Sequence, residues 1–111
     1  MPKKNKRKHP PRPHGYYPLS EIRELVKNRK VNIWGKAQAS ARNDFGWGVA
    51  DILKAFKMLK EHHFYKSEPS KFSPLIVMDF YKAHINGEDI YTHFYIDDSS
   101  KKLIISSFKQ E

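Results

Sequence analysis

The chain has 111 residues, no cysteine and a formal net charge of +9, so it is expected to form one domain without disulfides or thiolate metal sites. No apolar run approaches the ~20 residues that span a bilayer, and no apolar segment follows the basic N-terminus as a secretory signal would require. A small protein with this charge is expected to bind nucleic acid, an anionic surface or an acidic partner.

Residues 1–15 are predicted to form a flexible basic tail. Their lysines and arginines repel one another, and their prolines prevent a regular helix or a sheet ladder. Lys3, Lys4 and Arg7 could add sequence-independent affinity for phosphates. Alternatively, the segment is a solubilising extension without a specific partner, and the two interpretations remain open. A single folded domain is predicted over residues 16–111.

Helical periodicity dominates the first half of this domain. Ser20 can cap a helix whose apolar residues, from Leu19 to Val26, recur on one face. Residues 35–44 are rich in helix formers and predict a second, short helix, whereas residues 31–34 are too short to assign. Apolar residues from Val49 to Leu59 recur at three- and four-residue steps, which predicts an amphipathic helix of about three turns.

After Phe64 the hydrophobic period changes to two. Strands are predicted over residues 74–85, 89–96 and 102–108. The Asn-Gly pair at 86–87 is a strong hairpin signal, although the two acidic residues after it could lengthen the loop. A second turn is predicted over residues 97–101. Helices followed by an antiparallel meander indicate an α+β fold with the helices packed on the sheet.

One face of the predicted sheet is left open. The helices should cover the face that carries Ile90 and Phe94, so Tyr91, His93 and Tyr95 should point away from them. Lysines and aromatic residues elsewhere in the second half can join this face. The candidate residues for holding phosphates and stacking bases there are Tyr65, Lys66, Lys82, Tyr91, His93, Tyr95 and Lys109.

The same groups could also cleave RNA. That reaction needs a group to deprotonate the 2′-hydroxyl, one to protonate the leaving 5′-oxygen and a cation for the developing charge. Histidine suits the proton transfers because its ordinary pKa lies near neutrality. Composition alone favours plain RNA binding over catalysis, and a merely solvated sheet face is a further alternative. His62 and His63 are adjacent and cannot form an i, i+4 metal pair, so no metal is predicted.

Four segments, in this order, resemble the MqsR family of toxins, and the resemblance runs from about Pro18 to Lys109. It implies a RelE-like fold and a ribosome-independent mRNA interferase of a bacterial type II toxin–antitoxin system. Such an enzyme cuts single-stranded mRNA by metal-independent transesterification, needs no cofactor, acts in the bacterial cytoplasm and is held in check by an MqsA-like antitoxin. The segments are LSEIRELVKNRKV, GVADILKAFKMLKEHHFYKS, MDFYKAHINGEDIYTHFYI and LIISSFKQE.

The resemblance also implies site residues. Lys66 in FYKS, Tyr91 and Lys109 in SFK stand at the family's catalytic positions. The family's glutamine falls at Met78, which cannot donate a conventional hydrogen bond; a register shifted by one would place Asp79 there instead. His93, two residues from Tyr91, could take over a proton transfer and give activity a pH limb near neutrality. The alternative function is a non-catalytic nucleic-acid-binding module on the same fold.

Overall fold

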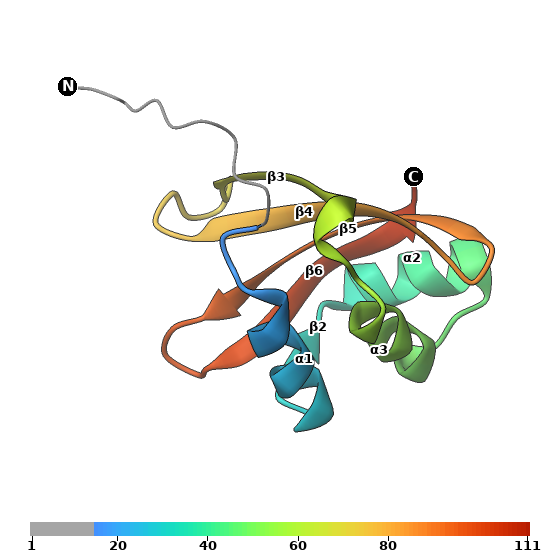
Figure 1. The fold of residues 1–111 in the computed structure, drawn as a ribbon, viewed down its shortest axis with the longest axis horizontal. Helices are drawn as coiled ribbons and strands as arrows, with labels where there is room; N and C mark the ends of the chain where they lie inside the picture. Colours follow the sequence, from blue (N-terminus) through green and yellow to red (C-terminus); the bar gives the residue numbers. More distant parts are fainter. Residues whose placement is uncertain (1–14) are drawn as a thin grey trace.

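The computed structural model describes residues 15–111, and within them three helices lie on one face of a five-stranded sheet (Figure 1). The predicted α+β architecture is therefore confirmed. The tail residues Lys3, Lys4 and Arg7 lie outside the described residues. Among the described residues no helix is long and apolar enough to cross a membrane. The helices are α1 (Leu19–Lys27), α2 (Gly35–Phe45) and α3 (Val49–Lys57), and the strands are β2 (Val31–Ile33), β3 (Phe64–Pro69), β4 (Val77–Ile85), β5 (Glu88–Asp97) and β6 (Lys102–Gln110).

The strands are ordered β2-β6-β5-β4-β3, and all neighbours are antiparallel except β2 and β6. The meander of β4, β5 and β6 was predicted. The prediction of a purely antiparallel sheet was wrong, because β2 adds a parallel edge strand in which Val31 pairs with Leu103. A strand of three residues is too short for its period to show in the sequence. The opposite edge is β3, which a short 3-10 turn at Glu61–His63 introduces.

Local chemistry sets the ends of these elements. The chain enters α1 through Pro18, whose carbonyl accepts hydrogen bonds from the N–H groups of Glu21 and Ile22, both at 3.1 Å. Ser20 therefore lies inside the first turn, and its predicted capping role is wrong. Asn86 and Gly87 both have positive φ, as a two-residue hairpin turn requires. Strand β5 begins directly at Glu88, so the loop is not lengthened.

The core lies between the helices and the sheet. Phe56 of α3 packs its ring 5.2 Å from that of Phe94, and Phe94 in turn stacks on Tyr81 at 5.4 Å. All three side chains are fully buried, as are Ile90 and Phe108. The helices thus cover the Ile90 and Phe94 face, as predicted, and the other face of the sheet is available for a site.

A buried carboxylate fixes the start of the described chain. Asp79 of β4 accepts hydrogen bonds from the backbone N–H groups of Tyr16 and Tyr17, each at 2.9 Å, and from the Ser67 hydroxyl. A Cβ atom on Gly15 would collide with this carboxylate, so only glycine fits there. Asp79 thereby holds the segment before α1 against strand β4.

Candidate functional site

The strand register arranges the predicted site residues in rows across the open face. In the first row Lys82 of β4 stands opposite Tyr91 of β5, which stands opposite Lys109 of β6. Side chains two residues apart on a strand share a face, so the next row belongs to the same surface. That row consists of Lys66, Phe80, His93 and Ser107. The four predicted catalytic residues are therefore neighbours, although they are separated by up to 43 positions (109 − 66) in the chain.

Phe80 lies at the centre of this arrangement. The Lys66 Nζ atom is 4.8 Å from the centre of its ring, and the His93 and Tyr91 rings lie 4.8 and 6.1 Å away. On the far side of Tyr91, the Lys109 Nζ atom is 5.6 Å from the tyrosine ring. Phe80 was not predicted as a site residue. Its position two residues before Lys82 could have placed it on the same face.

Two ion pairs neutralise part of the positive charge of the open face. Lys66 contacts Glu68 at 3.2 Å, and this hydrogen bond raises the pKa of the lysine. Lys82 contacts Glu111 at 3.3 Å, and its Nζ lies 4.0 Å from the centre of the exposed Tyr65 ring. These pairs are more than a third exposed, so each contributes little to stability. An incoming phosphate can therefore replace the carboxylates at small cost.

His93 is neutral at physiological pH. Burial, followed by the positive charges of Lys109 and Lys36, lowers its pKa to about 4, and the opposing effect of Glu68 is smaller. The expectation that His93 titrates near neutrality is therefore wrong. The physical reason is first its burial and then its location near lysines, and the sequence could reveal neither before the strands were paired.

A bulge in β6 holds this histidine in place. His93 is opposite Ser107 and Phe94 is opposite Ile105, so Ser106 is an extra residue between them. The buried Ser106 hydroxyl donates to the His93 carbonyl oxygen at 3.1 Å, and its Oγ lies 2.7 Å from the His93 Nδ1 atom. A hydroxyl has one proton. Because the carbonyl takes it, we assign the imidazole proton to Nδ1, which leaves Nε2 as the acceptor.

Met78 also contacts this serine. It belongs to the open-face side of β4, and its Sδ atom lies 4.0 Å from Ser106 Oγ. It is buried in a small apolar cluster with Tyr95 and Ile104. The residue at the position where the family resemblance places a glutamine is therefore apolar here. Ser106 contacts both this methionine and His93. Sequence reasoning missed Ser106, because nothing in IISSF distinguishes a bulge from a regular strand.

The prediction that Tyr95 binds RNA is not compatible with its burial. Its side chain is only 9% exposed. Alternation places it on the open-face side, but the loop between β3 and β4 covers that end: the Phe72 ring lies 5.9 Å from Tyr95 and 5.6 Å from Trp34. Burial also raises the pKa of the Tyr95 hydroxyl. Tyr95 is part of the packing that closes one end of the open face.

Asp79 is not available to the open face either. Its carboxylate points to the helix side of the sheet, where it holds Tyr16, Tyr17 and Ser67. The alternative in which Asp79 occupies the family's glutamine position would require it to abandon these bonds. Among residues 15–111 there is also no cluster of three or more His, Asp or Glu side chains that could hold a metal ion.

The family model described as "motility quorum-sensing regulator, toxin of MqsA" matches residues 12–110 of the chain. The chain belongs to the MqsR toxin family. A comparison with curated proteins found no match. The family match covers every strand of the MqsR-type sheet, including the segments that carry Lys66, Tyr91 and Lys109. The resemblance inferred from the sequence is thereby confirmed, whereas the roles of the individual residues stay predictions.

Proposed function

We propose that this MqsR-family toxin is an endoribonuclease that cleaves single-stranded mRNA without the ribosome. Its partner would be an MqsA-like antitoxin of a type II toxin–antitoxin system in the bacterial cytoplasm. The observation that carries the proposal is the grouping of Lys66, Tyr91 and His93 around Phe80 on an open sheet face, with Lys109 on the far side of Tyr91. Cations, a phenol and a neutral imidazole are the groups that RNA transesterification needs.

In the proposed reaction the 2′-oxygen attacks the adjacent phosphorus. A bond forms between them, the bond from phosphorus to the 5′-oxygen breaks, and a 2′,3′-cyclic phosphate remains. His93 Nε2 takes the proton of the 2′-hydroxyl, and the Tyr91 hydroxyl supplies a proton to the leaving 5′-oxygen. Lys66, which lies against Phe80, and Lys109, which lies against Tyr91, stabilise the charge that develops on the phosphate oxygens.

Substrate binding is assigned to neighbouring groups. Tyr65 is exposed at the edge of the sheet and offers a ring for base stacking. Lys82, beside it, can contact a phosphate after exchange of its ion pair with Glu111. Lys3, Lys4 and Arg7 would add phosphate contacts from the N-terminal segment, which should steepen the salt dependence of binding.

The proposed activity predicts a specific product. Free protein should cleave single-stranded RNA in the presence of a chelator, leaving a 2′,3′-cyclic phosphate or its hydrolysed form and a 5′-hydroxyl. Mass spectrometry of the fragments identifies both ends. Ends that carry a 3′-hydroxyl, or loss of cleavage on addition of chelator, would contradict this mechanism.

A non-catalytic RNA-binding module is the second candidate. It is favoured by the apolar side chain of Met78, which stands where the family resemblance places a polar glutamine. In that case the wild-type protein would bind the same RNA with salt-dependent affinity but leave it intact. The cleavage assay above, run beside a binding assay on the same RNA, distinguishes the two candidates.

The state of His93 can be measured without any activity. Nitrogen-15 NMR should show a neutral ring protonated on Nδ1 at pH 7, with a pKa of about 4. Because the folded pKa lies below the ordinary value, the unfolded chain binds more protons as the pH falls from about 6.5 to 4. As the pH falls across this window, His93 therefore lowers the free energy of unfolding progressively. In His93→Gln this free energy should fall less steeply with pH.

Ser106→Ala is the matched variant for this measurement. It removes the hydrogen bond to Nδ1 and should shift the ring toward the Nε2-protonated form, while Ser107→Ala, one residue along the strand, should leave it unchanged. A ring that stays protonated on Nδ1 without Ser106 would show that the serine does not set the tautomer.

A further inference from the structure

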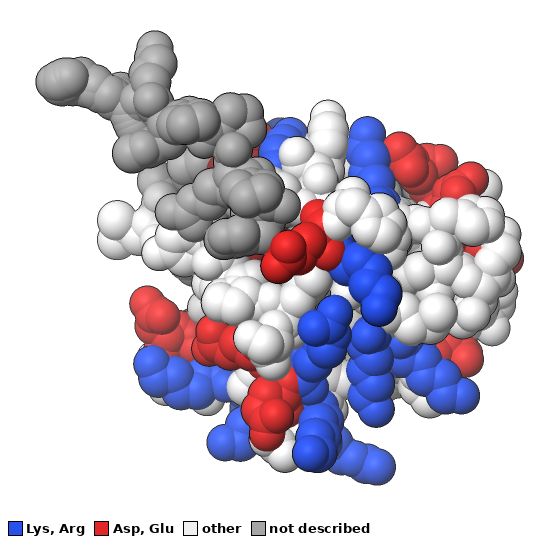
Figure 2. Space-filling view, viewed as in Figure 1, with Lys and Arg blue, Asp and Glu red and all other residues white. Residues whose placement is uncertain are grey.

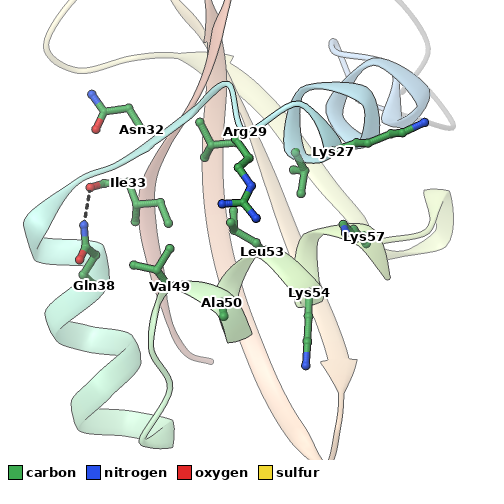
Figure 3. A pocket seen from close by; sticks show the side chains of 12 residues that line it. Lys27, Arg29, Asn32, Ile33, Gln38, Val49, Ala50, Leu53, Lys54 and Lys57 are labelled. Carbon is green, nitrogen blue, oxygen red and sulfur yellow. Dashed lines mark hydrogen bonds between the residues drawn. The ribbon is translucent and has the colours of Figure 1, made fainter.

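A second surface lies away from the open face and takes no part in the proposed chemistry. It is a groove of about 750 Å³ between the end of α1, strand β2 and helix α3 (Figure 3). Figure 2 shows Lys and Arg side chains gathered in the lower half of the view, where Figure 1 places α1 and α3. The groove is thus built by the helical half of the molecule and by one edge of the sheet.

The charge of this groove has one sign. Lys27 and Arg29 come from the end of α1 and the residues after it, whereas Lys54 and Lys57 come from α3, and no acidic residue lines the groove. None of these four cations forms an ion pair with another residue of the described chain. In contrast, two lysines of the open face are each paired with a glutamate. The groove therefore presents uncompensated positive charge.

The floor of the groove is aliphatic and adjoins a strand edge. Leu53 and Val49 of α3 face β2 across it, and Val49 is 45% exposed. Strand β2 pairs only with β6 among the strands of the described chain. Backbone groups of alternate residues face opposite edges, so those of Val31 and Ile33 point away from β6. Gln38 donates to the Ile33 carbonyl at 2.9 Å, and the remaining groups offer a short template for another strand.

We propose that this groove binds an extended, acidic segment of the antitoxin, with aliphatic side chains on the Val49 and Leu53 floor and carboxylates on the four cations. The inference rests on the proposed toxin–antitoxin function. It also implies that the antitoxin can hold the toxin without covering Lys66, Tyr91 and Lys109. The antitoxin would then block RNA by its bulk or its position rather than by filling the site.

Other occupants fit the groove less well. A second copy of this chain carries a net charge of +9, and its approach with the same basic surface is repulsive. The basic N-terminal segment of the chain itself is unsuitable for the same reason. Single-stranded RNA is held by aromatic stacking as well as charge, and no aromatic side chain lines the groove. Tyr65, whose exposed ring is proposed to stack a base, lies beside Lys82 of the open face instead.

The test is a binding measurement with the MqsA-family antitoxin encoded beside this toxin. The double variant Lys54→Glu/Lys57→Glu should weaken binding by about tenfold or more for each charge. Lys60→Glu/Lys71→Glu makes the same change in net charge at exposed positions outside the groove and should have little effect. Val49→Asp is the second variant. Its new carboxylate lies in the first turn of α3, where the helix dipole favours it, yet it should repel an acidic partner.

All variants should retain the RNA cleavage of the wild-type free toxin, which separates this inference from the proposed activity. Unchanged antitoxin affinity in both groove variants would overturn it, as would a wild-type chain that binds no such antitoxin. Loss of RNA affinity with normal antitoxin binding would also overturn it and assign the groove to RNA. If the protein bound the antitoxin through the groove but cut no RNA, only the proposed activity would fail.

Discussion

Lys66→Ala should lower kcat/KM for RNA cleavage by about 10² to 10³-fold, because it removes a preorganised charge from the developing phosphorane. The Lys66 Nζ atom lies 4.8 Å from the centre of the Phe80 ring, and it can exchange Glu68 for the phosphate when RNA binds. Lys66→Arg keeps the charge and should retain part of the rate. Tyr91→Phe and Lys109→Ala should each cost more than His93→Ala.

Binding and chemistry must be separated in this experiment. The affinity for an RNA with a 2′-deoxy nucleotide at the cleaved position, which cannot react, should fall much less than the rate. Lys71→Ala removes one exposed charge from the loop between β3 and β4 and serves as the matched control. Equal losses in Lys66→Ala and Lys71→Ala would mean that Lys66 acts only through the overall positive charge.

Asp79→Ala should lower the free energy of unfolding by about 3 kcal/mol, because hydrogen bonds to a charged group are worth about 1.5–3 kcal/mol and three donors lose their partner. For a domain of this size that corresponds to a fall in Tm of about 10 °C or more. Ser67→Ala removes only one donor and should cost far less. Thermal unfolding followed by circular dichroism gives both values.

The same pair of variants tests the place of Asp79 in the site. The cleavage rate of folded Asp79→Ala, measured below its Tm, should remain within a few-fold of the wild type. A loss as large as that of Lys66→Ala in a folded protein would show that the carboxylate acts in the reaction after all.

Much of the fold follows from patterns that are local in the sequence. The apolar spacing of Val49 to Leu59 and the Asn-Gly turn each fix one element without outside help, and both were predicted. Alternation along β5 likewise places Tyr91 and His93 on one face. Strand β2 was not predictable, since three residues form a strand only because β6 lies beside them.

Part of the candidate site was likewise predictable from local sequence patterns, and part was not. Lys66, Tyr91 and Lys109 carry a signal in the motifs around them, and the register brings them together as expected. The neutral state of His93 depends first on its burial and then on Lys109 and Lys36, which lie 16 residues after it (109 − 93) and 57 before it (93 − 36). Tyr95 lies on the face that strand alternation predicts, but Phe72 covers it. Phe72 belongs to a loop, whose path cannot be predicted from a repeating sequence pattern. These are tertiary effects, which a one-dimensional pattern does not contain.

The loop that carries Phe72 would limit how many nucleotides the proposed ribonuclease contacts. It closes one end of the open face by resting against Tyr95 and Trp34, so a polynucleotide has no path along the strands toward that end. Under the proposed function, the RNA would instead cross the β-strands, entering beside Tyr65 on β3 and leaving past Lys109 on β6. That crossing covers three strand spacings, about 14 Å. The toxin is therefore expected to recognise a short sequence of only a few nucleotides. Such a sequence occurs often enough that most transcripts would contain a cleavage site.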